Sequence, residues 1–160
     1  DKKNVEMLTS HSIFTEAELK SRYEIMLENY CKTIIIEANT MVDMAKTQIA
    51  PAVEAYSADV AKAAAAKKAL DSALVCSYET GIVRKLSALT DRIAVKAEEL
   101  ENAVISLNKA EDIGAESDMI RDTVLNLMGQ LRLACDEAET LTAKTYWPFP
   151  VYADLLFSVK

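Results

Sequence analysis

The chain has 160 residues, of which 51% are hydrophobic, and its formal net charge of −7 comes from 25 acidic against 18 basic residues. A negatively charged surface repels nucleic acid phosphates and anionic lipids, so neither is an expected partner. Glycine and proline occur only three times each, while Ala, Glu, Lys and Leu are abundant, and this composition predicts a single all-α domain.

Three features of the sequence predict a cytoplasmic location. No run of about 18 apolar residues is available to span a membrane, and the N-terminal residues lack the charged-then-apolar order of a signal peptide. The cysteines, Cys31, Cys76 and Cys135, are odd in number and widely spaced, which favours buried free thiols in a reducing compartment. Because the chain starts without a methionine, we also expect it to be a segment of a longer protein.

The first long helix has a clear start signal. Residues 1–14 are expected to form a short helical lead-in and a turn, and Thr15 followed by Glu18 then matches a capping box. Apolar residues follow at steps of three or four, which places them on one face of a helix that runs to about residue 68. These residues are Leu19, Tyr23, Met26, Tyr30, Ile34, Ala38, Met41, Ala45, Ile49, Ala52, Tyr56 and Val60. Pro51 lies inside this run and predicts a kink.

Two further helices are predicted after a turn somewhere in 69–78. The second carries apolar residues at alternating steps of three and four, and we expect it to end at Gly114 as a helix C-cap. The third starts near Ser117 with a heptad-like pattern and ends by Thr145. Together the three long helices predict an elongated antiparallel bundle. Because the first helix is the longest, one of its ends should lack cover within the chain and be available to a partner.

The C-terminal segment differs in composition from the rest of the chain. It holds five of the ten aromatic residues and two of the three prolines. We therefore divide the chain into a helical bundle domain, 1–145, and an extended tail, 146–160. Large aromatic side chains gain by burial, so the tail should pack either on the bundle or on a catalytic domain outside this chain. In the first case Tyr146, Trp147 and Phe149 should be buried against the helices.

The sequence predicts no catalytic, cofactor-binding or metal-binding residue. The three glycines are isolated and form no phosphate-binding loop. The single histidine, His11, has no neighbouring Cys or His with which to bind zinc. Glu28 and Lys32 predict a surface ion pair at the i, i+4 spacing. Glu37 lies beside the apolar face, where we expect a structural ion pair with one of the arginines Arg84, Arg92 and Arg132.

Two segments carry a resemblance to a known family. The first is Arg22-Tyr-Glu-Ile-Met-Leu-Glu-Asn-Tyr30, continued by Ile36-Glu-Ala-Asn-Thr-Met41, Ile49-Ala-Pro-Ala52 and Tyr56. The second is the tail, with Tyr146-Trp-Pro-Phe-Pro150 and Tyr152-Ala-Asp-Leu-Leu-Phe157. Together they resemble the C-terminal helical region of type III glutamine synthetases, a long-chain bacterial class, and Ile13-Phe-Thr-Glu-Ala-Glu-Leu19 fits the same pattern. Ala153 stands where glycine was expected.

The resemblance implies a role in glutamine biosynthesis, and so in nitrogen metabolism. Such ligases join ammonia to glutamate with ATP through a γ-glutamyl phosphate, using Mg or Mn ions held by carboxylates of a separate upstream catalytic domain. None of those motifs occurs in this chain, so no catalytic residue is carried over and the chain alone is not expected to be an enzyme. The family forms ring-shaped oligomers, which implies a domain for assembly, subunit contact or regulation. Its partners would be the catalytic domain of the same chain and neighbouring subunits.

Two other hypotheses come from different classes. The heptad pattern also suits a free-standing helical adaptor or a signalling coiled coil, although such a protein has no need of a Trp-Pro-Phe-Pro tail. The weakest alternative is a bundle enzyme with a carboxylate site around Glu37.

Overall fold

A computed structural model of the chain describes residues 1–157, except for the side chain of Tyr152. These residues form helices and loops, with no β-strand among them, as the all-α prediction requires. The α-helices are α1 (Lys2–Ser10), α2 (Glu16–Met44), α3 (Ala50–Leu70), α4 (Ser77–Ser106), α5 (Ile113–Met119), α6 (Leu125–Leu141) and α7 (Tyr152–Leu156). Wide π turns, η1 (Ala45–Ile49) and η3 (Ile120–Val124), join α2 to α3 and α5 to α6, and the 3₁₀ turn η2 (Leu107–Lys109) follows α4.

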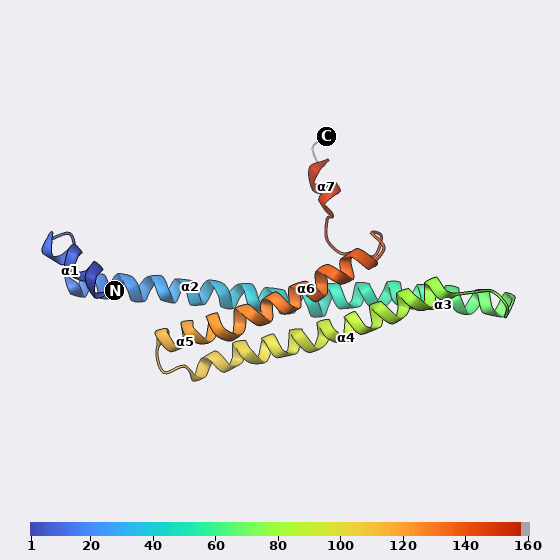
Figure 1. Cartoon of the computed structure of the whole chain (residues 1–160), viewed down its shortest axis with the longest axis horizontal. Coiled ribbons are helices and arrows are strands. Elements are labelled where there is room, and N and C mark those ends of the chain that lie inside the picture. Colours follow the sequence, from blue (N-terminus) through green and yellow to red (C-terminus); the bar gives the residue numbers. More distant parts are fainter. Residues whose placement is uncertain (158–160) are drawn as a thin grey trace.

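Three long helical segments lie side by side (Figure 1). The first runs through α2, η1 and α3, the second is α4, and the third runs through α5, η3 and α6. Helix α4 lies at the centre, because it contacts α3, α6 and α2. Its residues Leu86, Ile93 and Leu100 are fully buried, and their spacing of seven residues agrees with the predicted alternation of steps of three and four.

The start of α2 is the predicted capping box. The Thr15 side-chain oxygen accepts a hydrogen bond from the Glu18 backbone N–H at 3.2 Å, and the Glu18 carboxylate accepts one from the Thr15 backbone N–H at 2.8 Å. These bonds satisfy two donors that a helix start otherwise leaves unpaired. They also lower the pKa of Glu18.

Pro51 is accommodated by a wide turn just before it. The Ala50 backbone N–H donates to the Ala45 carbonyl, five residues back, and the helix continues to Leu70. A π turn gives room for a proline ring that would otherwise clash with the preceding turn. The bend of the axis that we predicted at Pro51 stays a prediction.

The prediction for Gly114 is wrong. Helix α4 ends at Ser106, and α5 begins at Ile113, so Gly114 lies in the first turn of the third segment and not at a C-cap. The cause is Asp112, whose carboxylate accepts a hydrogen bond from the Ala115 N–H at 2.8 Å and so caps the new helix. A Cβ atom at Gly114 would lie 3.1 Å from the same carboxylate, so the glycine leaves room for the cap.

The turn between α3 and α4 lies where the sequence placed it, at residues 71–76. Beside it, the buried side chain of Glu79 accepts a hydrogen bond from Lys67. This bond is the main reason that the pKa of Glu79 is lowered and that of Lys67 is raised. The pair therefore joins α3 to α4 next to the turn of the hairpin.

We expect Ile93→Ala to lower the free energy of unfolding by about 2–5 kcal/mol, because it leaves a cavity in the core. Val95→Ala, two residues along the same helix at an exposed position, should cost less than about 0.5 kcal/mol. Urea titrations followed by circular dichroism would measure both. Equal losses would show that α4 does not form the centre of the core.

We expect Glu79→Gln to lower the unfolding temperature at neutral pH. Because the pKa of Glu79 is lower in the folded chain, its carboxylate stabilises the fold fully above the ordinary value of 4.5, and this contribution is lost as the pH falls through the folded-state pKa. The difference between variant and wild type should therefore disappear at acidic pH in thermal melts. Glu98→Gln, at an exposed position of α4, is the matched control and should change little at either pH.

Candidate interaction surfaces

The residues that the sequence singled out for possible chemistry lie apart. His11 is exposed at the end of α1, and Glu37 is exposed on α2. The expected ion pair of Glu37 is wrong, because Arg92 pairs with Glu137 at 2.6 Å and Arg132 lies 3.5 Å from Asp136. In the part of the chain that the structure describes, no ion pair joins Glu37 to Arg84 either. The surface pair between Lys32 and Glu28 is confirmed at 3.0 Å.

The predicted free thiols are confirmed. Cys31, Cys76 and Cys135 are all buried and unpaired. Burial raises the pKa of Cys31, and it raises that of Cys135 to about 11, so these two thiols stay protonated at neutral pH. Residues 1–157 contain no group of three or more His, Cys, Asp or Glu side chains that could hold a metal ion. None of the described helices is both long and apolar enough to cross a bilayer.

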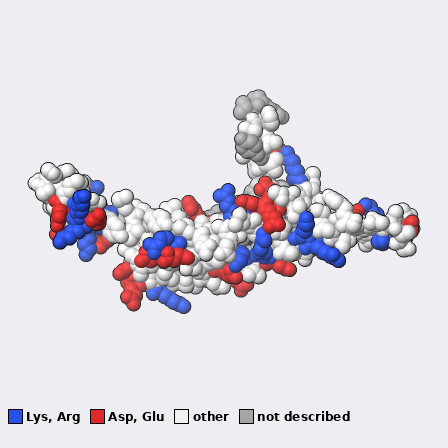
Figure 2. Space-filling model, viewed as in Figure 1, with Lys and Arg blue, Asp and Glu red and all other residues white. Residues whose placement is uncertain are grey.

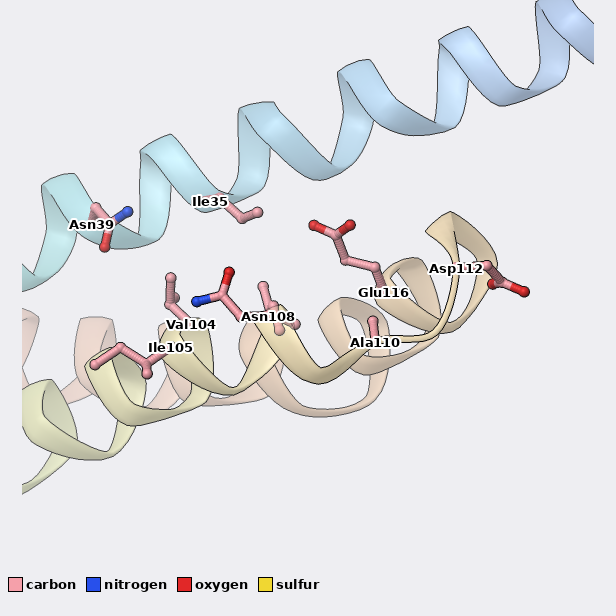
Figure 3. Close-up of a pocket in the computed structure, with 9 residues that line it drawn as sticks. Ile35, Asn39, Val104, Ile105, Asn108, Ala110, Asp112 and Glu116 are labelled. Carbon is pink, nitrogen blue, oxygen red and sulfur yellow. The ribbon is translucent and has the colours of Figure 1, made fainter.

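A cleft lies between α2 and the end of α4 (Figure 3). Its volume is about 610 Å³, and its polar side chains are those of Asn39, Asn108, Asp112 and Glu116. The side chain of Glu116 points toward α2 near Ile35 (Figure 3). Its carboxylate gives this end of the cleft a negative charge, which disfavours a phosphate or another anion.

The first half of α2 extends past the other two long segments (Figure 1). Four apolar side chains follow one another here at steps of three or four, and we call them the projecting face: Leu19, Tyr23, Met26 and Tyr30. Tyr23 is 63% exposed and Met26 is 72% exposed, whereas Cys31, at the start of the covered part, is 1% exposed. In Figure 2 the surface of α2 between α1 and the bundle is largely uncharged.

Helix α1 folds back beside the projecting face and forms a groove with α2. The groove has a volume of about 400 Å³. The side chains of Val5, Leu8, Leu19 and Tyr23 form its apolar part. Asp1, Asn4, Glu16 and Lys20 also line it, so its apolar part has charged and polar neighbours.

The C-terminal segment is fixed to the bundle by its first aromatic residues. The Tyr146 hydroxyl donates a hydrogen bond to Asp59 of α3 at 2.7 Å, and the Tyr146 ring lies 5.2 Å from that of Tyr56. This bond lowers the pKa of Asp59 and raises that of Tyr146. Trp147 and Phe149, half-buried, pack against the core and meet edge to face at 6.3 Å.

We predicted an extended tail over 146–160, and this is wrong for part of it. Beyond these anchors the segment contains a short helix. Residues Tyr152–Leu156 form the helix α7, because the Asp154 carboxylate accepts hydrogen bonds from the Val151 N–H at 3.1 Å and from Lys144 at 2.5 Å. Helix α7 points away from the bundle (Figure 1) and exposes Leu155, Leu156 and Phe157. The last three residues of the predicted tail, 158–160, lie outside the described residues.

Comparisons with known proteins agree with the resemblance seen in the sequence. The sequence model of one family, described as "Glutamine synthetase C-terminal domain", matches residues 1–68. The chain carries a glutamine synthetase C-terminal domain. The matched residues span α1, α2 and most of α3, and so include the whole projecting face.

Curated relatives extend this match along nearly the whole chain. A glutamine synthetase of Butyrivibrio fibrisolvens is 32% identical over 157 residues, which are 98% of this chain and 22% of that protein. A type-3 glutamine synthetase of Dictyostelium discoideum is 26% identical over 97% of this chain and 22% of its own length. A glutamine synthetase of Bacteroides fragilis strain YCH46 is 24% identical over 99% of this chain and 22% of its own length. The chain thus spans about a fifth of each of these glutamine synthetases.

Trp147 is the only tryptophan and therefore reports on the anchor of the C-terminal segment. We expect its emission maximum to lie at a shorter wavelength in the folded chain than in urea, because the indole is half-buried. Tyr146→Ala removes the hydrogen bond to Asp59 and should shift the emission toward longer wavelength and increase quenching by acrylamide. Tyr23→Ala, on the projecting face, is the control and should leave both unchanged. A solvent-like emission in the wild type would contradict the anchor.

Proposed function

We propose that this chain is a non-catalytic part of a glutamine synthetase and that it serves contact between parts of the assembled enzyme. The observation that carries the proposal is the exposure of large apolar side chains outside the core, and we assign two of these places to contact. One is the projecting face, with Tyr23 and Met26, and the other is α7, with Leu156 and Phe157. Clustered apolar side chains on a soluble domain mark surfaces that contact another protein.

In this proposal the ligation of ammonia to glutamate belongs to the rest of the parent enzyme. ATP and the divalent metal ions, Mg or Mn, would be bound there, as the similarity to glutamine synthetases implies. Two carboxylates, Asp112 and Glu116, line the cleft of Figure 3 together with two amides and apolar residues. The chain's own contribution is therefore mechanical: it holds catalytic parts or subunits in place. The buried free thiols suit a cytoplasmic enzyme.

The alternative function is a free-standing helical adaptor. Its support is a core that is continuous from α2 to α6 within this chain. Against it stands the coverage of the relatives, each of which has nearly four-fifths of its length outside the match. The reading frame that precedes Asp1 decides between the two, because an adaptor would not follow a glutamine synthetase catalytic domain.

Removing residues 1–160 from the parent enzyme should impair assembly before it impairs active-site chemistry. We expect native mass spectrometry to show smaller particles, while the subunits that remain assembled keep their turnover per site. A gentler variant replaces Leu156 and Phe157 by Asp, which leaves the core residues in place. The matched control replaces Leu70 and Val75 by Asp, at the exposed hairpin end. Wild-type particles with wild-type turnover after the deletion would contradict the proposed function.

A further inference from the structure

We infer that the projecting face and the adjoining α1–α2 groove are the docking site for the part of the same chain that precedes Asp1 in the full-length enzyme. The inference rests on the proposed function and names the partner of one surface. Three observations carry it: where α4 and α5 cease to cover α2, how the two ends of the long segment differ, and where Asp1 lies.

The first half of α2 is not covered by the bundle, because α4 ends and α5 begins beside the second half of α2. Ile35 of α2 lines the cleft of Figure 3 together with Asp112 and Glu116, so this cleft marks the turn between α4 and α5. Burial and, after it, the negative charge of Glu116 raise the pKa of Cys31, so α5 still lies near α2 at this residue. Between Cys31 and Thr15, α1 is the described element that packs on α2, and it leaves Tyr23 and Met26 mostly exposed.

The opposite end of the long segment lies beside the turn to α4, where Lys67 pairs with Glu79, and its composition differs. There α3 exposes alanines and lysines, in the run Lys62-Ala-Ala-Ala-Ala-Lys-Lys68, while Leu70, Val75 and Tyr78 are exposed at the turn to α4. Small side chains leave little apolar area in water, and lysine heads are well hydrated. The projecting face instead carries two tyrosines and a methionine, residue types that are enriched in the buried centres of interfaces. We place the partner at the α2 end, because its apolar residues follow one another on a helix and two of them, Leu19 and Tyr23, line a groove.

The position of Asp1 identifies this partner. Asp1 and Tyr23 line the same groove, and the N-terminus lies beside the start of α2 (Figure 1). The chain matches 22% of each relative, and the matched family is named for the C-terminal domain. The remaining length would thus join this domain at the rim of the groove. A short tether gives a high effective concentration, which favours docking within one chain over docking of a second copy.

The chemistry of the surface specifies what docks there. Its centre is apolar, and the rim carries Lys20 and Glu24, which lie 3.9 Å apart as an exposed pair. An apolar centre with a polar rim is the usual anatomy of a protein interface. The docking segment should therefore present an apolar patch to Tyr23 and Met26.

The test uses the full-length enzyme with the photo-crosslinking residue p-benzoylphenylalanine at position 26. We expect irradiation to give an adduct with the mass of one subunit, and peptide mapping to join residue 26 to a peptide that precedes Asp1. The control places the same residue at position 95, which is exposed on α4 and should give little of this adduct. An adduct with the mass of two subunits, joining residue 26 to another copy, would overturn the inference.

Hydroxyl-radical footprinting of the unmodified full-length enzyme covers the case in which no adduct forms. Tyr23 and Tyr78 are matched probes, since they are 63% and 69% exposed within this domain. We expect severalfold less labelling of Tyr23 than of Tyr78. In a Met26→Lys variant, whose substitution lies outside the core, labelling of Tyr23 should rise toward that of Tyr78.

The outcomes separate this inference from the proposed function. Equal labelling of Tyr23 and Tyr78 in the wild-type enzyme overturns the docking site. If deletion of residues 1–160 still breaks up the particles, the proposed function stands without it. If Tyr23 is protected and the adduct lies within one chain, but the deletion leaves assembly and turnover intact, then the docking site stands and the role in assembly falls.

Discussion

The fold depends on the apolar face of α4 that the other two long segments cover, which we call the seam. This helix is the element on which both other long segments pack, and Leu86, Ile93 and Leu100 are completely buried along it. Each such side chain stabilises the fold by roughly 1.5–3 kcal/mol through its removal from water. The ion pairs along the same helix, such as Arg92 with Glu137, are exposed, and exposed pairs contribute little. The ion pairs therefore contribute little to the stability of this fold, which comes mainly from the burial of apolar side chains along α4.

The seam was predictable because α4 is regular. Its apolar residues alternate at steps of three and four, and the structure buries Leu86, Leu89, Ile93, Ala97 and Leu100. The capping box at Thr15 was equally readable, since both of its hydrogen bonds are made between residues three apart. The tail was harder. Asp154 caps α7 three residues after Val151, but the two prolines ahead of it favoured an extended reading of the whole segment.

The π turns could not be assigned from the pattern, although it contained a signal for one of them. Buried residues follow each other at steps of four through Ala45, Ile49, Val53 and Ser57. In a regular α-helix each such step drifts by about 40° around the axis, since a turn takes 3.6 residues. A π turn at Ala45–Ile49 absorbs the extra residue and keeps the stripe directed at α4. The same argument applies where η3 links Ile120 to Val124, both fully buried.

The surfaces assigned to contact were visible in the sequence only as an excess of length and of aromatic residues. The position of the projecting face follows from the seam, because α4 has 30 residues while the helical path from Glu16 to Leu70 is longer and continues well past the Ser106 end of α4 (Figure 1). The residues outside the seam do not hold the fold, so Tyr23 and Met26 can be shaped by a partner without loss of core packing. The C-terminal segment shows the same division. Trp147 and Phe149 pack against the core. Phe157 is 80% exposed and is available for contact with a partner of α7.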